Sequence, residues 1–396
     1  MSRPRLLQPV LAKALDLFPA VLVTGPRQSG KTTLVREMAP GQAAYLSLDD
    51  PLVRAVARSD PNGLLVRYAE ALTILDEVQH APELLTYLKL RIDQERHRVG
   101  RFLLTGSQQF GLMAGVSESL AGRVAILELL PFSLLELPKG HREDLATMLW
   151  NGFYPEPALY PERRDLWLSS YVQTYVERDV RQLVNVQDLA AFETFLSLVA
   201  ARHSQVTNFA ELARDSGVTL PTAKSWLGVL TAGYLVYALQ PYFENLGKRL
   251  VRSAKVYLLD SALAMALTRQ PSPEAALAGS MAGAFFEGWV VSEAVKAFTS
   301  LGRRPDLYFW RSHDGLEVDL LVDLGGKWLP VEIKLTATPT PRHAEPLTKL
   351  CSLFGDRATS TGLLVCRVNE PRPLPGGHEA MPWHQFPGWL LERLGR

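Results

Sequence analysis

The chain has 396 residues, of which 47% are hydrophobic and 21% are charged. This composition is ordinary for a globular protein and excludes disordered, collagen-like and coiled-coil chains, and at about 100–200 residues per domain the length predicts two or three domains. The 42 Lys and Arg residues against 41 Asp and Glu leave a net charge of +1, so any contact with nucleic acid or anionic lipid must come from a local patch.

Cysteine content and hydropathy bear on the compartment. The 2 cysteines, Cys351 and Cys366, cannot build a disulfide framework or a four-cysteine zinc site, which predicts a reducing, cytoplasmic location. The N-terminal stretch that begins at Arg3 predicts an amphipathic helix rather than a signal peptide, because Lys13 and Asp16 interrupt the apolar run. No stretch approaches the roughly 18 uncharged apolar residues of a membrane span, so no membrane partner is expected.

The clearest motif follows the apolar run at 20–24. It fits the pattern GxxxxGK[ST] of a phosphate-binding loop, with a strand before it and a helical sequence after it. Backbone N–H groups of such a loop and the helix N-terminus bind phosphates. Lys31 is predicted to reach the β- and γ-phosphates of ATP, and Thr32 to hold Mg²⁺. The predicted ATP-binding residues are Gly25, Pro26, Arg27, Gln28, Ser29, Gly30, Lys31, Thr32 and Thr33.

A second apolar run, residues 72–75, ends in the carboxylates of Asp76 and Glu77. Asp76 is predicted to help hold Mg²⁺ and Glu77 to activate the attacking water. The alternative is a pair of solvated acids at a strand end. A third apolar run, 101–106, leads to Ser107 and Gln108, either of which could contact the γ-phosphate or the water, although an exposed loop serine is an equally ordinary interpretation.

Together with a further strand at 43–49, these runs predict an α/β domain with a parallel sheet over roughly the first 135 residues. Four segments carry a resemblance to a bacterial and archaeal family of AAA-type ATPases with a C-terminal domain of uncharacterised function. They are Gly25–Thr33, Leu75–Gln79, Leu104–Gln108 and Glu118–Arg123. The resemblance spans nearly the whole chain. It implies a homo-oligomer, for which a ring is one possible form, and an arginine of one subunit that completes the active site of its neighbour. Arg123 is the candidate, with an ordinary ion pair as the alternative role, and Arg178 is its rival.

The middle region is predicted to be mostly helical. Residues 209–215 predict a helix stopped by Gly217, and a second helix begins near Pro221. Extended runs at 234–239 and 250–257 predict a β-hairpin, so the whole resembles a winged helix. Trp226 is expected in its core.

DNA contact through this region is a prediction from charge. Residues 201–256 hold seven basic side chains against three acidic ones, a local net charge of +4. Lys248 and Arg249 lie where the tip of the hairpin should contact phosphates. Winged helices also dock proteins, which is the alternative. The seven are Arg202, Arg214, Lys224, Lys248, Arg249, Arg252 and Lys255, and the three are Glu211, Asp215 and Glu244.

The C-terminal region predicts a long helix from Gly283, then extended runs at 307–311, 316–322 and 328–334. Because strand side chains alternate, Glu332 and Lys334 should share one face, where Asp319 could meet them. Two carboxylates suit Mg²⁺, and a lysine beside them can orient or deprotonate a water.

A helix Glu, a strand Asp and a Glu-x-Lys together resemble the PD-(D/E)xK nuclease superfamily, which includes restriction enzymes and archaeal Holliday-junction resolvases. The resemblance implies catalytic roles for Glu287, Asp319, Glu332 and Lys334, with Asp319 and Glu332 as metal ligands. Such domains can keep the fold without cutting.

The predicted organisation is an AAA-type ATPase domain at 1–140, a helical region with a winged helix at 141–270, and a restriction-endonuclease-like α/β domain at 271–396. The predicted function is Mg²⁺-dependent ATP hydrolysis acting on DNA, including branched DNA in recombination or repair. Two alternatives remain: a nucleotide-dependent switch whose C-terminal modules bind protein, and a defence nuclease in which ATP gates cleavage.

Overall fold

The computed structural model divides the chain into two compact units. The first comprises Met1–Phe132 with Ala232–Tyr234 and Thr299–Arg303, and the second comprises the rest. The predicted division at 140 and 270 stays a prediction. The residues that the structure describes are 3–39, 41–107, 115–116, 119–174, 188–243, 253–312 and 315–395.

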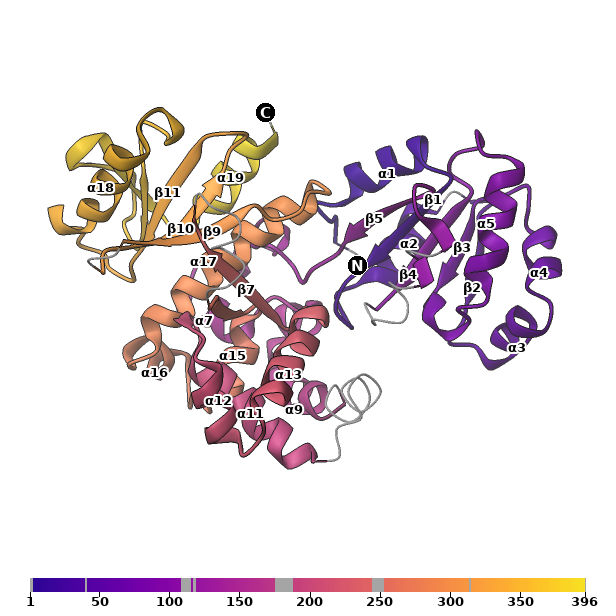
Figure 1. Ribbon diagram of the computed structural model, residues 1–396, viewed down its shortest axis with the longest axis horizontal. Helices are drawn as coiled ribbons and strands as arrows, with labels where there is room; N and C mark the ends of the chain where they lie inside the picture. The colour runs from indigo at the N-terminus through magenta and orange to yellow at the C-terminus, as the bar shows by residue number, and fades with distance from the viewer. Residues whose placement is uncertain are drawn as a thin grey trace. The chain divides into compact units, whose positions relative to one another are not determined.

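The first unit is built on a parallel five-stranded sheet with the strand order β2-β3-β4-β1-β5 (Figure 1). Its strands are β1 (Ala20–Thr24), β2 (Ala44–Ser47), β3 (Thr73–Asp76), β4 (Phe102–Gly106) and β5 (Val124–Glu128). The four strands predicted from the sequence are present, whereas β5 was not predicted. It lies at an edge, where its residues are mostly half-buried, although four of its five residues, Val124–Leu127, are apolar.

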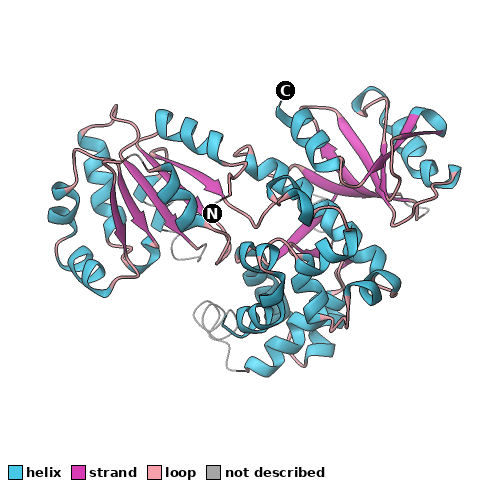
Figure 2. Cartoon of the chain, turned by 180° about the vertical axis from the view of Figure 1, so that it is seen from behind, coloured by secondary structure: helices cyan, strands magenta, loops and turns pink. Residues whose placement is uncertain are grey.

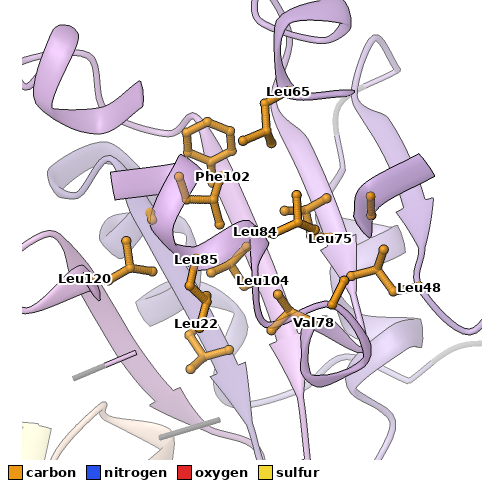
Figure 3. Packing of buried hydrophobic residues seen from close by; sticks show 14 of the residues in the cluster. Leu22, Leu48, Leu65, Leu75, Val78, Leu84, Leu85, Phe102, Leu104 and Leu120 are labelled. Carbon is orange, nitrogen blue, oxygen red and sulfur yellow. The ribbon is translucent and has the colours of Figure 1, made fainter. Parts of the chain in front are cut away.

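Helices cover both faces of this sheet. Successive residues of β1 point to opposite sides, because Leu22 belongs to one apolar cluster while Val21 and Val23 belong to the other. The cluster shown in Figure 3 packs Leu75 and Leu104 against α5. The helices are α1 (Gln8–Leu17) and α2 (Lys31–Met38), which supply residues to the second cluster, and α3 (Pro51–Ser59), α4 (Pro61–Arg67) and α5 (Leu84–Gln94), which supply the first.

The second unit begins with helices and contains the two predicted helices of the pair, followed by two strands that pair antiparallel. Asn208 accepts hydrogen bonds from the first turn of α12, and Gly217 ends that helix at φ 72°. Trp226 of α13 packs edge-on against Phe192 and Phe195, which places it in the core. The helices are α7 (Leu145–Asn151), α8 (Pro155–Leu159), α9 (Arg164–Thr174), α11 (Leu189–Ala201), α12 (Phe209–Ser216), α13 (Leu220–Ala232), α15 (Ser261–Leu267) and α16 (Pro273–Ala278).

The predicted hairpin and the C-terminal strands belong to one nine-stranded sheet. Its order is β13-β14-β12-β11-β10-β9-β7-β8-β6, and the join is a short parallel pairing of β7 with β9. Its strands are β6 (Gln205–Val206), β7 (Val236–Pro241), β8 (Lys255–Leu258), β9 (Leu307–Arg311), β10 (Glu317–Asp323), β11 (Trp328–Ile333), β12 (Leu363–Cys366), β13 (Arg372–Leu374) and β14 (His378–Pro382). Within the described part, β7 and β8 pair antiparallel, and residues 244–252 between them lie outside it.

Three further helices follow in the chain: α17 (Ala282–Ser300), α18 (Glu345–Phe354) and α19 (Phe386–Gly395), which Figure 1 labels. Figure 2 shows the chain from behind, with helices in cyan and strands in magenta. The long helix predicted from Gly283 corresponds to α17, and the predicted strands correspond to β9, β10 and β11. Among the described residues, no helix combines the length and the apolar character that a membrane crossing requires.

Candidate functional site

The loop between β1 and α2 has the backbone that its glycines predict. Gly25 lies at φ 146°, and a Cβ there would sit 2.2 Å from the backbone oxygen of Leu129, so a larger residue would displace the loop. Gly30 lies at φ 94° and precedes the first turn of α2. The Lys31 ammonium donates to the backbone oxygens of Gly25 (3.0 Å) and Pro26 (2.8 Å). The lysine therefore crosses the concave side of the loop.

Two other features of the loop were not predicted. The Arg5 guanidinium donates to the backbone oxygens of Ser29 (2.8 Å) and Leu130 (2.7 Å) and lies against the Phe132 ring. It fixes the loop to the segment after β5, and a lone arginine near the N-terminus gives no sequence signal for this. Gln28 has a positive φ of 60°.

Among the other loop residues, Arg27 is partly exposed, Gln28 and Thr33 are exposed, and Ser29 is buried.

Asp76 is the point at which three elements meet. Its carboxylate accepts hydrogen bonds from Thr32 of α2 (3.0 Å to Oδ2), from Tyr45 of β2 (2.5 Å) and from Thr105 of β4. Burial and the Asp76 carboxylate raise the pKa of Tyr45, which keeps its hydroxyl a donor. The C-terminal edge of the sheet thus brings Thr32 and Asp76 together, as the sequence predicted, and adds Tyr45 and Thr105.

Glu77 follows Asp76 in a left-handed conformation, with φ 59° and ψ 50°, which is uncommon for a residue with a side chain. Its N–H donates to the Thr105 hydroxyl at 3.0 Å. Its carboxylate accepts from the Gln79 amide, which also lies 3.4 Å from the Ser107 hydroxyl. Glu77 and Ser107 are therefore linked through Gln79 at the same sheet edge.

Tyr45 gives a first testable consequence. If its hydroxyl orients Asp76 for Mg²⁺, Tyr45→Phe should raise the Mg²⁺ concentration that gives half-maximal ATP turnover by roughly fivefold, the equivalent of one net hydrogen bond of about 1 kcal/mol. Turnover measured against Mg²⁺ and, separately, against ATP checks this, with the exposed Tyr160→Phe as control. An unchanged Mg²⁺ dependence would remove Tyr45 from this role.

Arg123 is not brought to this edge. It directly precedes β5 and so lies at the opposite, N-terminal end of the parallel strands. Its guanidinium contacts both oxygens of Asp93, at 2.7 and 3.0 Å, and these hydrogen bonds lower the pKa of Asp93. Arg178 and Gln108 lie outside the described residues.

A second polar cluster lies in the second unit and contains all four residues of the nuclease prediction. The Lys334 ammonium contacts Asp319 Oδ2 (2.8 Å) and Glu332 Oε1 (2.7 Å). Glu287 reaches the same cluster from α17, because Lys255 lies between it and Asp319, with Nζ–O distances of 3.1 and 3.9 Å. The sequence predicted this convergence but not Lys255.

The cluster is crowded with negative charge. Burial, followed by the neighbouring Asp319 carboxylate, raises the pKa of Glu332 to about 8, and burial raises that of Glu287. Among the described residues, no group of three or more His, Cys, Asp or Glu side chains is arranged to hold a metal ion. Lysines fill the space between these acids.

The basic patch predicted for DNA is smaller than the sequence count indicated. Lys255 is buried among carboxylates, so it does not belong to the surface. Arg202 and Arg214 both pair with Asp215. Lys224 on α13 is exposed, whereas Lys248, Arg249 and Arg252 lie outside the described residues. Net charge in a sequence window does not distinguish exposed cations from buried ones.

Three family models match successive parts of the chain. An AAA domain matches residues 17–137, a domain of unknown function (DUF8612) matches 142–274, and a second domain of unknown function (DUF4143) matches 282–386. The first match covers the β1–β5 sheet and the loop that holds Lys31. The first unit therefore contains an AAA domain.

Relatives and solved structures extend this comparison. The uncharacterized protein Rv2008c of Mycobacterium tuberculosis and the uncharacterized protein Mb2031c of Mycobacterium bovis are each 35% identical over 333 residues, which is 83% of this chain and 73% of theirs. The structure of the Walker-type ATPase of Pyrococcus abyssi aligns with 66% of this chain and 94% of its own, at 13% identity and a TM-score of 0.41. The chain belongs to the family of these two mycobacterial proteins, and its first unit contains an AAA domain.

Proposed function

We propose that this chain hydrolyses ATP with Mg²⁺ at the β1–α2 loop, and that it does so as a homo-oligomer acting on DNA. The observation that carries the hydrolytic part is the meeting of Thr32 and Asp76, 3.0 Å apart, at the sheet edge that also holds Lys31 and Glu77. A hydroxyl and a carboxylate are oxygen donors of the kind that Mg²⁺ prefers. The site therefore fits the metal by its donor chemistry.

Each residue then has a defined task. Loop N–H groups and the α2 N-terminus would bind the phosphates. The Lys31 ammonium would exchange its hydrogen bonds to the Gly25 and Pro26 backbone oxygens for contacts with the β- and γ-phosphates. Thr32 and Asp76 would hold Mg²⁺, which when bound neutralises charge on the transferring phosphoryl group. Glu77 would accept a proton from the attacking water, and the Gln79 link to Ser107 would hold its carboxylate at this edge.

Phosphate release by the purified chain tests the hydrolytic proposal directly. Turnover should require Mg²⁺, stop when EDTA is added and resume when Mg²⁺ is restored. Turnover that is equal with and without EDTA would contradict a magnesium-dependent site at Thr32 and Asp76.

The proposed homo-oligomer can be tested through Arg123. If Arg123 leaves Asp93 and acts on the neighbouring subunit's ATP, Arg123→Ala should lower turnover by about 10³-fold, as loss of a finger does. Mixing it with inactive Lys31→Ala should restore part of the activity, because a mixed interface pairs an intact loop with an intact arginine. Normal turnover by Arg123→Ala would show that Arg123 is not the finger, which leaves Arg178 or no arginine of this chain in that role.

The proposal that the chain binds DNA rests on the arrangement of residues 188–258. The order of α11, β6, α12, α13, β7 and β8, with β8 paired to both β6 and β7, is the order expected of a winged helix, and Lys224 is exposed on the second helix of the pair. We propose that this face and the segment 244–252 contact phosphates.

The matching experiment measures binding of duplex and branched DNA at several salt concentrations. Lys248→Ala with Arg249→Ala should weaken binding to all sequences about equally and flatten the log–log salt slope by roughly 0.9 for each phosphate that is no longer neutralised. The exposed Lys13→Ala is the control for removal of a surface charge. An unchanged affinity and slope, together with ATP turnover that DNA does not stimulate, would favour the protein-docking switch.

Nuclease activity of the second unit remains a prediction. Glu287, Asp319, Glu332 and Lys334 lie together, which supports it, but lysine ammonium groups already contact the predicted metal ligands. Nicking of a plasmid with Mg²⁺ or Mn²⁺, abolished in Asp319→Ala, is the result that would support an ATP-gated nuclease.

A further inference from the structure

Lys255 is a cation buried among carboxylates that come from other parts of the chain. It belongs to β8, while the acids come from α17 and β10. Its side chain is 5% exposed, and its Nζ lies 3.1 Å from Glu287 Oε1, 2.5 Å from Glu317 Oε1 and 3.9 Å from Asp319 Oδ1. Three carboxylates around one positive centre are the donor set that a divalent cation would use.

The oxygens of Asp319 and Glu332 are engaged by donors or cations with one exception, Glu332 Oε2. Asp319 Oδ2 accepts from Lys334 Nζ at 2.8 Å and from the Ile333 N–H at 2.9 Å, so both Asp319 oxygens face a donor or a cation. Glu332 Oε1 contacts Lys334. Glu332 Oε2 is buried and has no hydrogen-bond partner among the described residues. A divalent cation could reach Asp319 only by displacing an ammonium group.

Local structure holds Lys255 in this place. It pairs with Leu239 in the β7–β8 register, and its neighbour on the same strand face, Tyr257, donates to Glu287 Oε1 at 2.6 Å.

We propose that Lys255 is the built-in cation of this cluster, and that its ammonium takes the place of a divalent metal among Glu287, Glu317 and Asp319. The cluster therefore binds a divalent metal only when Lys255 is removed. This proposal concerns the second unit alone and is independent of ATP hydrolysis. It explains why the acids of the nuclease prediction can lie together in a folded chain, since two lysines offset their mutual repulsion.

Calorimetric titration with MnCl₂ tests it on the full chain. All proteins carry Asp76→Asn, so that the ATP site adds no metal binding. The chain with Lys255 should show no Mn²⁺ site that depends on Asp319. Lys255→Met should gain an Mn²⁺ site, with an affinity about tenfold or more above that of any Mn²⁺ binding by the chain with Lys255. The reason is that carboxylates without a counter-charge attract the metal. Adding Asp319→Asn to Lys255→Met should abolish it, and the exposed Lys327→Met should change nothing.

Lys255→Met leaves buried carboxylates unpaired and can unfold the chain. A second variant therefore tests the proposal in a protein with less unpaired charge. Lys255→Met with Glu317→Gln removes one charge of each sign and keeps two acids for the metal. Circular dichroism reports whether it folds. A folded variant that binds Mn²⁺ no better than the chain with Lys255 overturns the proposal. So does an Asp319-dependent Mn²⁺ site in the chain with Lys255, a result that needs no folded variant.

Discussion

Replacing Glu77 by glutamine is expected to leave ATP bound while slowing its hydrolysis by about 10²–10⁴-fold, the usual contribution of a general base. The amide has nearly the shape of the carboxylate but cannot accept the proton of the attacking water. Glu77 makes few contacts that the change would break, since its backbone N–H, not its side chain, donates to Thr105. Binding of a fluorescent ATP analogue and release of phosphate, measured on the same protein, separate the two effects.

The matched control is Glu37→Gln, at an exposed position of α2, which should change neither binding nor turnover. A second comparison uses Gln79→Ala. Because Gln79 joins Glu77 to Ser107, its loss should lower turnover less than Glu77→Gln and leave ATP affinity intact. Wild-type turnover in Glu77→Gln would overturn the assignment of Glu77 as the base.

The residues at the edge of the β1–β5 sheet could be located from the sequence because their signals are local. Gly25 and Gly30 mark the loop, and the apolar runs that end at Asp76 and Ser107 mark neighbouring parallel strands whose ends must share an edge. Tyr45, Thr105 and Arg5 escaped prediction because each acts through a contact made across the fold. No sequence pattern around a tyrosine in a strand, or around an arginine before a helix, predicts such a tertiary contact.

The second unit shows the same limit on a larger scale. Helix and strand periodicity located α12, α13 and the β7–β8 pair, but the pairing of β7 with β9 joins segments far apart in sequence, and no local pattern encodes it. Lys255 illustrates the consequence. In the sequence it is one of seven basic residues counted between residues 201 and 256, whereas tertiary packing buries it beside Glu287 and Glu317.

Lys31→Ala is expected to have the other large effect, on binding as well as on turnover. Lys31 Nζ lies within hydrogen-bond distance of the Gly25 and Pro26 oxygens, so it is held on the concave side of the loop where phosphates would enter. A hydrogen bond from a charged group contributes about 1.5–3 kcal/mol, which corresponds to ATP binding weaker by roughly tenfold to 100-fold. Hydrolysis should fall further, on the order of 10²–10³-fold, because the cation also stabilises charge that develops in the transition state.

Two comparisons decide whether the missing ammonium, rather than a damaged loop, is responsible. Lys31→Arg keeps the charge but places a planar group where a compact one fits, so it should recover part of the affinity and little of the turnover. Lys13→Ala removes an exposed lysine of α1 and should behave as wild type. The Lys31 ammonium accounts for two contacts to loop oxygens, so thermal unfolding should show only a small loss of stability. If Lys31→Ala bound and hydrolysed ATP normally, the loop would have to bind phosphates through its backbone alone, and the proposed site would be wrong.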